Sequence, residues 1–186
     1  MKVVRVEGSF SSWRDQARHC LEEGVPPRDV LWGEEGEQGE LFEGLEGSRV
    51  AEKSVSYEIA PKQSIGSEDL HVPKMFVELA ELVSCHSNPE RWGLLYQTLW
   101  RIVRKGERRL LYVATDGDIS RLAEMAREVR RDLHKMRAFV RFRKVGEEES
   151  GRENFVAWFE PSHHIVRRNS AFFRKRFAGM NWSILT

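Results

Sequence analysis

The sequence has few cysteines and no long apolar run, and each absence excludes a class of protein. The 186 residues include only 2 cysteines, Cys20 and Cys85, which are too far apart for a zinc motif or a disulfide framework. Each follows apolar residues at helical spacing, so we expect both thiols to be buried and reduced. The start lacks the apolar core of a signal peptide, and no segment has the length of a membrane span. These absences predict a soluble, cytoplasmic protein that does not contact a membrane.

Several motifs of well-known enzyme classes are also missing. The sequence contains no Walker A loop, no dinucleotide-binding glycine fingerprint, no CxxxCxxC cluster motif and no nucleophile elbow. We therefore expect no cofactor. Whether the protein is an enzyme stays open, because an enzyme can lack all of these motifs.

Charge is distributed unevenly along the chain. The formal net charge is only +1, but residues 1–70 carry 8 lysines and arginines against 15 acids, whereas residues 71–186 carry 22 against 14. No acid follows Glu160. This asymmetry indicates a basic working surface on the second part, or an acidic part that packs beside it and neutralises it.

The acidic part is predicted to begin with a β-α-β segment. Residues 2–8 have the β-branched content of a strand, residues 9–24 have helical periodicity, and an extended segment follows at 30–32. Ser11 or Ser12 can cap this helix, whose apolar face is Trp13, Ala17, Cys20 and Leu21, and Gly24 ends it. An acidic, glycine-rich mobile loop is predicted at 33–48, and a strand at 49–60.

Three helices are predicted next, in the basic part of the chain. The first begins at Pro73, with Met75, Phe76, Leu79, Leu82 and Val83 at helical spacing, and the second is capped by Asn88 and ends near Gly106. The apolar face of this second helix consists of Trp92, Leu95, Tyr96, Leu99, Ile102 and Val103. The third starts near residue 116, and its core stripe is Ile119, Leu122, Ala126, Val129, Leu133 and Met136.

The third helix also carries charges at regular spacing on its exposed side. Glu124, Glu128 and Asp132 each precede a cation by three residues, namely Arg127, Arg131 and Lys135, and such pairs can form weak surface ion pairs. After this helix, alternation of apolar and polar residues predicts a β-hairpin at 138–145 and 154–160. A last helix over 163–177 places Ile165, Phe172, Phe173 and Phe177 opposite a basic face. Together these elements predict a single α+β domain over 1–186: a small N-terminal β-α-β segment, a central helical layer, and a C-terminal β-hairpin and basic helix.

The basic faces favour nucleic-acid binding, because cations neutralise phosphates and arginine can grip a phosphate bidentately. Phe139, Phe142 and Trp158 could stack on unpaired bases, although their pattern favours a place in the core. The alternative for the cations is a merely solubilising surface. The candidate nucleic-acid-binding residues are Arg127, Arg130, Arg131, Lys135, Arg137, Arg141, Arg143, Arg167, Arg168, Arg174 and Lys175.

A small group of histidines and one acid is the best candidate for catalysis. His134, Glu160 and His163 could move protons, with His164 beside them. Their spacing fits no zinc motif, so we expect no metal, and nothing in the sequence brings His134 near the others. A role in hydrogen bonding or phosphate contact is favoured over catalysis for this group.

Several strings of the sequence resemble a known family. "RRDLHKMRAFVRFR", "FVAWFEPSHHI" and "RFAGMNWSILT" are similar to a bacterial family of domains of unknown biochemical function, described as DNA-metabolism or DNA-repair proteins. "SFSSWRDQAR", "GVPPRDVLW" and "LVSCHSNPERWGLLYQTLWR" extend the likeness over nearly the whole chain, although His164 stands where an aromatic such as Tyr is expected. Family members stand beside a radical-SAM protein or are fused in front of a uracil-DNA glycosylase-like domain. The resemblance implies a DNA-related role with such a partner, and glycosylase chemistry is not assigned to these residues.

These observations predict a DNA-binding or adaptor module in DNA repair or modification, acting on duplex or single-stranded DNA. One alternative is a nucleic-acid-processing enzyme that uses His134, Glu160 and His163. Another is a purely protein-binding subunit whose basic face meets an acidic patch on a radical-SAM or glycosylase partner.

Overall fold

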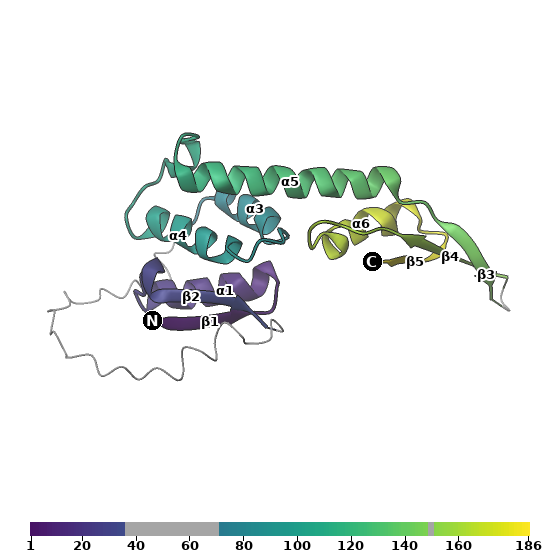
Figure 1. The fold of residues 1–186 in the computed structure, drawn as a ribbon, viewed down its shortest axis with the longest axis horizontal. Coiled ribbons are helices and arrows are strands. Elements are labelled where there is room, and N and C mark those ends of the chain that lie inside the picture. The colour runs from purple at the N-terminus through teal and green to yellow at the C-terminus, as the bar shows by residue number, and fades with distance from the viewer. Residues whose placement is uncertain (36–70, 149–150) are drawn as a thin grey trace, which may run out of the picture. The chain divides into compact units, whose positions relative to one another are not determined.

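The computed structural model describes residues 1–35, 71–148 and 151–186. They form α-helices and two small sheets, of two and three strands, which confirms the predicted α+β class (Figure 1). No helix among these residues is long and apolar enough to cross a membrane. The rest of the predicted acidic loop and the predicted strand at 49–60 lie outside the described residues.

The chain divides into two compact units, and the division does not follow the change of charge at residue 70. The first unit is Met1–Val72 with Trp92–Arg108, and the second is Pro73–Arg91 with Arg109–Thr186. The segment 92–108 therefore belongs with the N-terminal residues, although its charge pattern groups it with the basic part. That all of 1–186 is one domain stays a prediction.

The first unit contains the predicted β-α-β segment. Strands β1 (Lys2–Val6) and β2 (Val30–Glu34) pair in parallel, and helix α1 (Phe10–Glu22) connects them (Figure 1). The predicted apolar face of α1 is buried throughout. β2 continues two residues beyond the predicted extended segment, through Gly33 and Glu34, because both stay in register with β1.

The ends of α1 correct one detail of the prediction. The N-cap is Ser9, whose hydroxyl accepts the peptide N–H of Ser12, and not Ser11 or Ser12 itself. The helix starts earlier because Phe10 joins its first turn and its ring lies 6.0 Å from that of Trp13. Gly24 ends the helix as predicted, with a φ of 68° that a residue with a Cβ rarely adopts.

Helix α4 (Arg91–Val103), from Trp92 onward, completes the core of the first unit. Trp13 stacks on Trp92 at 6.4 Å between ring centroids, and the indole N–H of Trp13 donates to the Trp92 carbonyl at 3.2 Å. The Tyr96 hydroxyl donates to the Val25 carbonyl at 2.6 Å. Asn88 makes the predicted capping hydrogen bond in the turn that leads into this helix, since its side chain accepts the peptide N–H of Glu90 at 2.8 Å.

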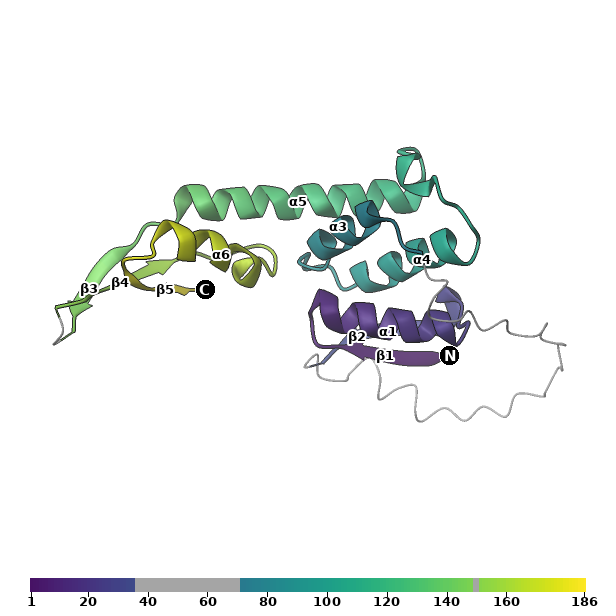
Figure 2. The same cartoon turned by 180° about the vertical axis from the view of Figure 1, so that it is seen from behind.

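The second unit is built on one long helix, α5 (Gly117–Phe139), capped by the Asp116 carboxylate. Helix α3 (Lys74–Val83) packs along its first half, and helix α6 (Val166–Arg176) lies at its second half (Figures 1 and 2). The predicted core stripe of α5 is buried at every position. Met75 of α3 was predicted to be in the core but is exposed, because it lines a surface hollow with Leu79 and Leu111.

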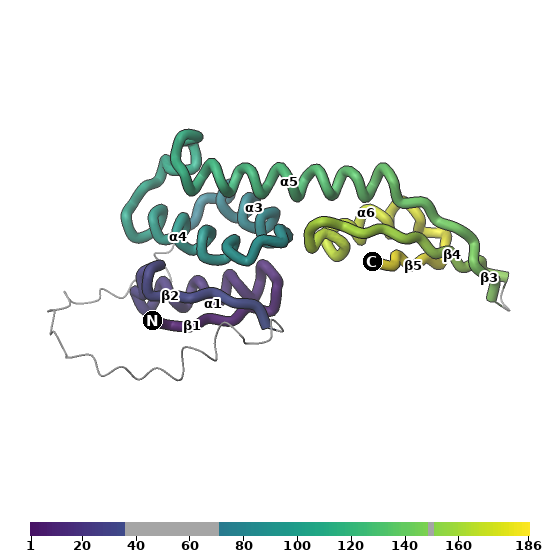
Figure 3. The backbone as a smooth tube through the Cα atoms, in the orientation of Figure 1, coloured from purple at the N-terminus to yellow at the C-terminus, as the bar shows by residue number. Residues whose placement is uncertain are grey.

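A three-stranded sheet follows α5, and the tube in Figure 3 traces its path. The predicted hairpin is present as β3 (Arg143–Glu147) and β4 (Glu153–Trp158), but α5 extends through Phe139 and so takes its first residues. After α6, strand β5 (Asn181–Leu185) pairs in parallel with β4. The sequence did not predict β5. Phe142, Phe173 and Trp182 pack together on the side of the sheet that faces α6.

The two cysteines differ in their surroundings. Cys20 is fully buried on α1, as predicted. Cys85 lies two residues beyond the end of α3 and is only half-buried, so it is not part of a helical stripe. Burial raises the pKa of both thiols above the usual value.

Candidate functional site

Three of the predicted nucleic-acid-binding cations already have partners within the second unit. Arg137 donates through Nε to the side-chain oxygen of Asn169 at 2.6 Å, and its guanidinium lies 5.0 Å from the centroid of the Phe172 ring. Arg141 donates to the carbonyls of Ala138 and Val140 at the end of α5. These contacts give both arginines a structural role that the sequence pattern did not indicate.

Arg168 is the third cation with a partner. It donates to the Glu81 carbonyl at 3.1 Å and lies 3.9 Å from the Glu81 carboxylate. The sequence has no acid after Glu160, which made the basic face of α6 look unscreened. Glu81, which precedes α6 by more than eighty residues, shows that an acid remote in sequence can still screen one of its charges.

The other predicted cations are exposed, and none forms a side-chain hydrogen bond or salt bridge with any residue that the structure describes. They are Arg127, Arg130, Arg131 and Lys135 on α5, Arg143 on β3, and Arg167, Arg174 and Lys175 on α6. No described side chain therefore neutralises these charges directly. This leaves the charges available to an anionic ligand at little desolvation cost.

The predicted ion pairs along α5 do not form, because two of the acids bind elsewhere. Glu128 accepts a hydrogen bond from His86 at 2.8 Å, and buried Asp132 accepts the peptide N–H of His163 at 3.0 Å. Arg131 and Lys135 are left without these acids as salt-bridge partners. The basic row of α5, defined here as Arg127, Arg131 and Lys135, is therefore less neutralised than its sequence suggested.

One face of the three-stranded sheet exposes both an aromatic ring and a cation. Arg143 lies directly opposite Val156 in the β3–β4 register, and Trp158, two residues further along β4, is on the same face. Trp158 is 66% exposed and pairs in register with exposed Leu185 of β5. Trp158 and Phe139 were expected to lie in the core, and both are exposed; only Phe142 packs as predicted.

Among the described residues, no side-chain hydrogen bond or ion pair joins those predicted to carry catalysis. Asp132 points to His163, and His134, two residues later on α5, lies on another side of the helix and is exposed. Glu160 is exposed and makes no side-chain hydrogen bond with any described residue. His164 is exposed, and its peptide N–H donates to the Cys85 carbonyl. Only His163 joins a cluster of polar side chains.

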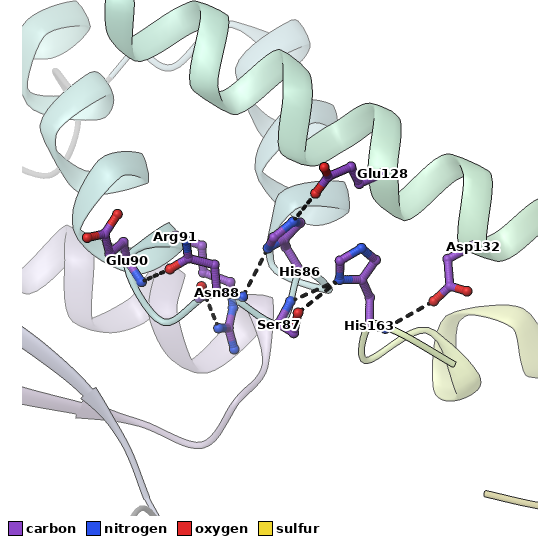
Figure 4. Close-up of polar contacts among 8 residues, drawn as sticks. All are labelled: His86, Ser87, Asn88, Glu90, Arg91, Glu128, Asp132 and His163. Atoms are coloured by element: carbon purple, nitrogen blue, oxygen red, sulfur yellow. Dashed lines mark hydrogen bonds and ion pairs between the residues drawn. The ribbon is translucent and has the colours of Figure 1, made fainter. Parts of the chain in front are cut away.

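That cluster contains residues that the sequence did not single out (Figure 4). His86 follows α3, Glu128 is on α5, and His163 lies between β4 and α6. The two imidazole rings are 4.3 Å apart between centroids, and Glu128 contacts the His86 ring. We call these three residues the His–Glu cluster.

Hydrogen bonds fix the protons of both rings. Nδ1 of His86 accepts the Asn88 peptide N–H at 3.0 Å, so the proton of the neutral ring is on Nε2 and is donated to Glu128. Nδ1 of His163 accepts the Ser87 peptide N–H at 3.2 Å, and the Ser87 hydroxyl lies 3.1 Å from the same atom. Both rings are therefore held with Nδ1 facing backbone and Nε2 directed away from it.

The surroundings of the cluster set the charges of its side chains at neutral pH. Burial, and to a smaller extent the neighbouring His86, lowers the pKa of His163, so this ring is neutral. The hydrogen bond from His86 lowers the pKa of Glu128, so this side chain is a carboxylate. The cluster thus combines two imidazoles with one negative charge, a combination that can exchange protons or hold a cation.

Sequence reasoning missed His86 and Glu128 for a physical reason. They are 42 residues apart, and His163 is 76 residues from Ser87, so no local spacing relates them. A weak signal was available for Asp132, which lies about 40° around the helix from buried Met136 and so borders the core stripe. An acid at that position favours a buried partner over a surface ion pair.

Comparison with known proteins identifies one family. Residues 89–186 match a family described as Domain of unknown function (DUF4130). No curated protein matches the chain, and no solved structure matches it. The matched segment includes α5, α6 and the three-stranded sheet, and thus Glu128 and His163, whereas His86 precedes it.

Proposed function

The chain belongs to the DUF4130 family, a domain of unknown function, and from this premise we propose that it binds DNA through the phosphate backbone. The observation that carries the proposal is the set of exposed cations in the second unit that form no hydrogen bond or salt bridge with any described residue. Cations without protein partners release condensed counterions when they meet phosphates, and this release is the main source of sequence-independent affinity.

The basic row of α5 has a spacing suited to a phosphate backbone. Arg127, Arg131 and Lys135 follow each other at intervals of four residues, which on an α-helix is about 6 Å along the axis. The row therefore spans about 12 Å, the axial length of roughly three to four phosphates on one strand of B-DNA. Arg167, Arg174 and Lys175 on α6 supply a second group of the same sign.

Exposed Trp158 supports binding of single-stranded DNA in particular. Trp158 is exposed and is on the same face of the sheet as Arg143. Proteins that bind single strands combine a cationic path for the backbone with aromatic rings on which bases stack. A duplex keeps its bases stacked on each other, so it has less use for this ring.

The biological role proposed is DNA metabolism or repair, as an adaptor that acts with a radical-SAM or uracil-DNA glycosylase-like partner. The support for this role is the family resemblance of the strings around residues 130–143, 155–165 and 176–186. The support for DNA contact is independent of this resemblance, because that support comes from the charges alone. If the basic surface instead meets an acidic protein partner, the experiment below separates the two.

The test compares two triple variants of equal charge. One is Arg127→Gln, Arg131→Gln and Lys135→Gln on α5, where glutamine retains helix propensity. The control is Arg18→Gln, Arg28→Gln and Lys105→Gln, three exposed cations of the first unit that have no side-chain partner among the described residues. Affinity for a labelled duplex and for a single strand is measured by fluorescence anisotropy over a series of salt concentrations.

The α5 variant should reduce the magnitude of the negative slope of log affinity against log salt by roughly 2.7 for duplex, at about 0.9 per cation, and by roughly 2.1 for a single strand. The control should leave the slope near that of the parent chain. A folded α5 variant with the parental slope would show that the row does not contact DNA. Equal losses in both variants would show that only net charge matters, and either result would favour a protein partner for the basic surface.

A further inference from the structure

The His–Glu cluster has the geometry of a metal site. One potential ligand atom from each of His86, Glu128 and His163 lies within 4.8 Å of the other two. Two ligand atoms of a tetrahedral ion at about 2.1 Å are roughly 3.4 Å apart, so side-chain shifts of under about an ångström would bring all three into contact with one ion. Figure 4 shows the three side chains converging from three separate segments of the second unit.

We propose that His86, Glu128 and His163 bind Zn²⁺. Neutral imidazole nitrogens and a carboxylate oxygen are ligands that zinc prefers, and two histidines with one carboxylate leave a position for water or another oxygen donor. No thiolate is among the three, which fits a site with an open position better than a closed structural site. From the sequence we expected no metal, because the spacing of His163 could be compared only with that of His134 and Glu160. The residues that the fold places beside His163 are remote from it in sequence.

The charge around the cluster suits a divalent cation. Glu128 contributes one negative charge, and buried Asp132 contributes a second from the adjacent turn of α5, where it accepts the His163 peptide N–H. Arg131 lies close enough to influence Glu128 but forms no salt bridge with it. Asp132 is therefore a positioning residue, since it orients the segment that carries His163.

Zinc binding must move a proton on each ring, and the hydrogen bonds show where it goes. Each Nε2 would give up its proton when its lone pair binds the ion, and each Nδ1 would take one up, so that both rings stay neutral. At His163 the hydrogen bond from the Ser87 peptide N–H must break, and the Ser87 hydroxyl, 3.1 Å from Nδ1, can accept the new Nδ1–H. At His86 the Asn88 peptide N–H occupies Nδ1, so this hydrogen bond must break when the ion binds.

The lead variant is Glu128→Gln, which keeps the size and helix propensity of the side chain but removes its charge. The matched control is Glu124→Gln, one turn earlier on α5, where the side chain is exposed and has no partner among the described residues. A second variant, His163→Ala, tests an imidazole ligand. Untagged full-length chain is depleted of metal and titrated with Zn²⁺ against a chromophoric chelator, while ¹⁵N NMR follows the Asn88 amide.

The expected result is one Zn²⁺ per chain, with affinity lowered at least 10-fold in Glu128→Gln and in His163→Ala and unchanged in Glu124→Gln. The Asn88 amide resonance should shift on zinc addition in the parent chain and in Glu124→Gln, and at a higher zinc concentration in the two ligand variants. The proposal is wrong if the parent chain binds no stoichiometric Zn²⁺, or if folded Glu128→Gln and His163→Ala both bind like the parent. No nucleic acid is present in this titration, so its outcome is independent of the proposed DNA binding.

Discussion

The strength of the hydrogen bond between Arg137 and Asn169 distinguishes two roles for Arg137, one in stabilising the fold and one in contacting DNA. Asn169 is 0% exposed on α6, and its side-chain oxygen accepts a hydrogen bond from Arg137 at 2.6 Å. Its amide group donates to the Leu133 carbonyl of α5 at 3.3 Å. This one side chain therefore makes two hydrogen bonds that connect α6 to α5.

Asn169→Ala should lower the free energy of unfolding by about 3 kcal/mol. The hydrogen bond from a charged donor contributes about 1.5 kcal/mol, taken from the low end of the range because Arg137 is itself exposed. The weaker bond to the Leu133 carbonyl contributes about 0.5 kcal/mol, and the small cavity left by the amide group about 1 kcal/mol.

A double-mutant cycle isolates the pair. Arg137→Ala should cost about 2 kcal/mol in the parent chain but only about 0.5 kcal/mol after Asn169→Ala, a coupling of about 1.5 kcal/mol. Urea unfolding followed by far-UV circular dichroism measures the free energies, and hydrogen exchange of the α6 amides localises the effect. A coupling below about 0.5 kcal/mol would refute this reasoning and return Arg137 to the set of cations available to DNA.

Two further experiments, thiol labelling and a helix-cap substitution, test other parts of the fold. Burial raises the pKa of Cys20 and Cys85, so both thiols stay protonated at pH 7 and should react slowly with a thiol reagent in the native state. Cys85 should react first, because it is only half-buried. Rapid labelling of both thiols without denaturant would contradict their burial. Ser9→Ala should destabilise the protein by about 1 kcal/mol, because it removes the N-cap of α1, whereas Ser11→Ala should cost much less; equal costs in thermal unfolding would argue against Ser9 as the cap.

The elements that the sequence predicted well are those whose information is local. The core stripe of α5 repeats at intervals of three and four residues, and every member is buried. Gly24 ends α1 because only a residue without a Cβ readily adopts its φ of 68°. In both cases neighbouring residues alone contain the physical cause of the structure.

Strand β5 was missed because its cause is not local. "NWSIL" at 181–185 alternates weakly, and it becomes a strand by pairing in parallel with β4, more than twenty residues earlier. A parallel pair needs a crossover, here α6, and no turn signal marks such a connection. The exposure of Trp158 escaped prediction for a related reason, since the side of the sheet that faces α6 depends on this topology.

The acids of α5 show how a local pattern can mislead about a site. Spacing paired Glu128 with Arg131 and Asp132 with Lys135, but an exposed ion pair of this kind contributes only about 0.3–0.5 kcal/mol and must order two long side chains. A peptide N–H or a buried ring is already fixed by the fold, so an acid that binds one loses less conformational entropy. Asp132 binds the His163 peptide, and Glu128 binds His86. The preference of these acids for partners that the fold already fixes leaves the basic row without them and also assembles the His–Glu cluster. If the acids formed ion pairs along α5 instead, the cations of the row would be neutralised and Glu128 would not be available to the proposed zinc site.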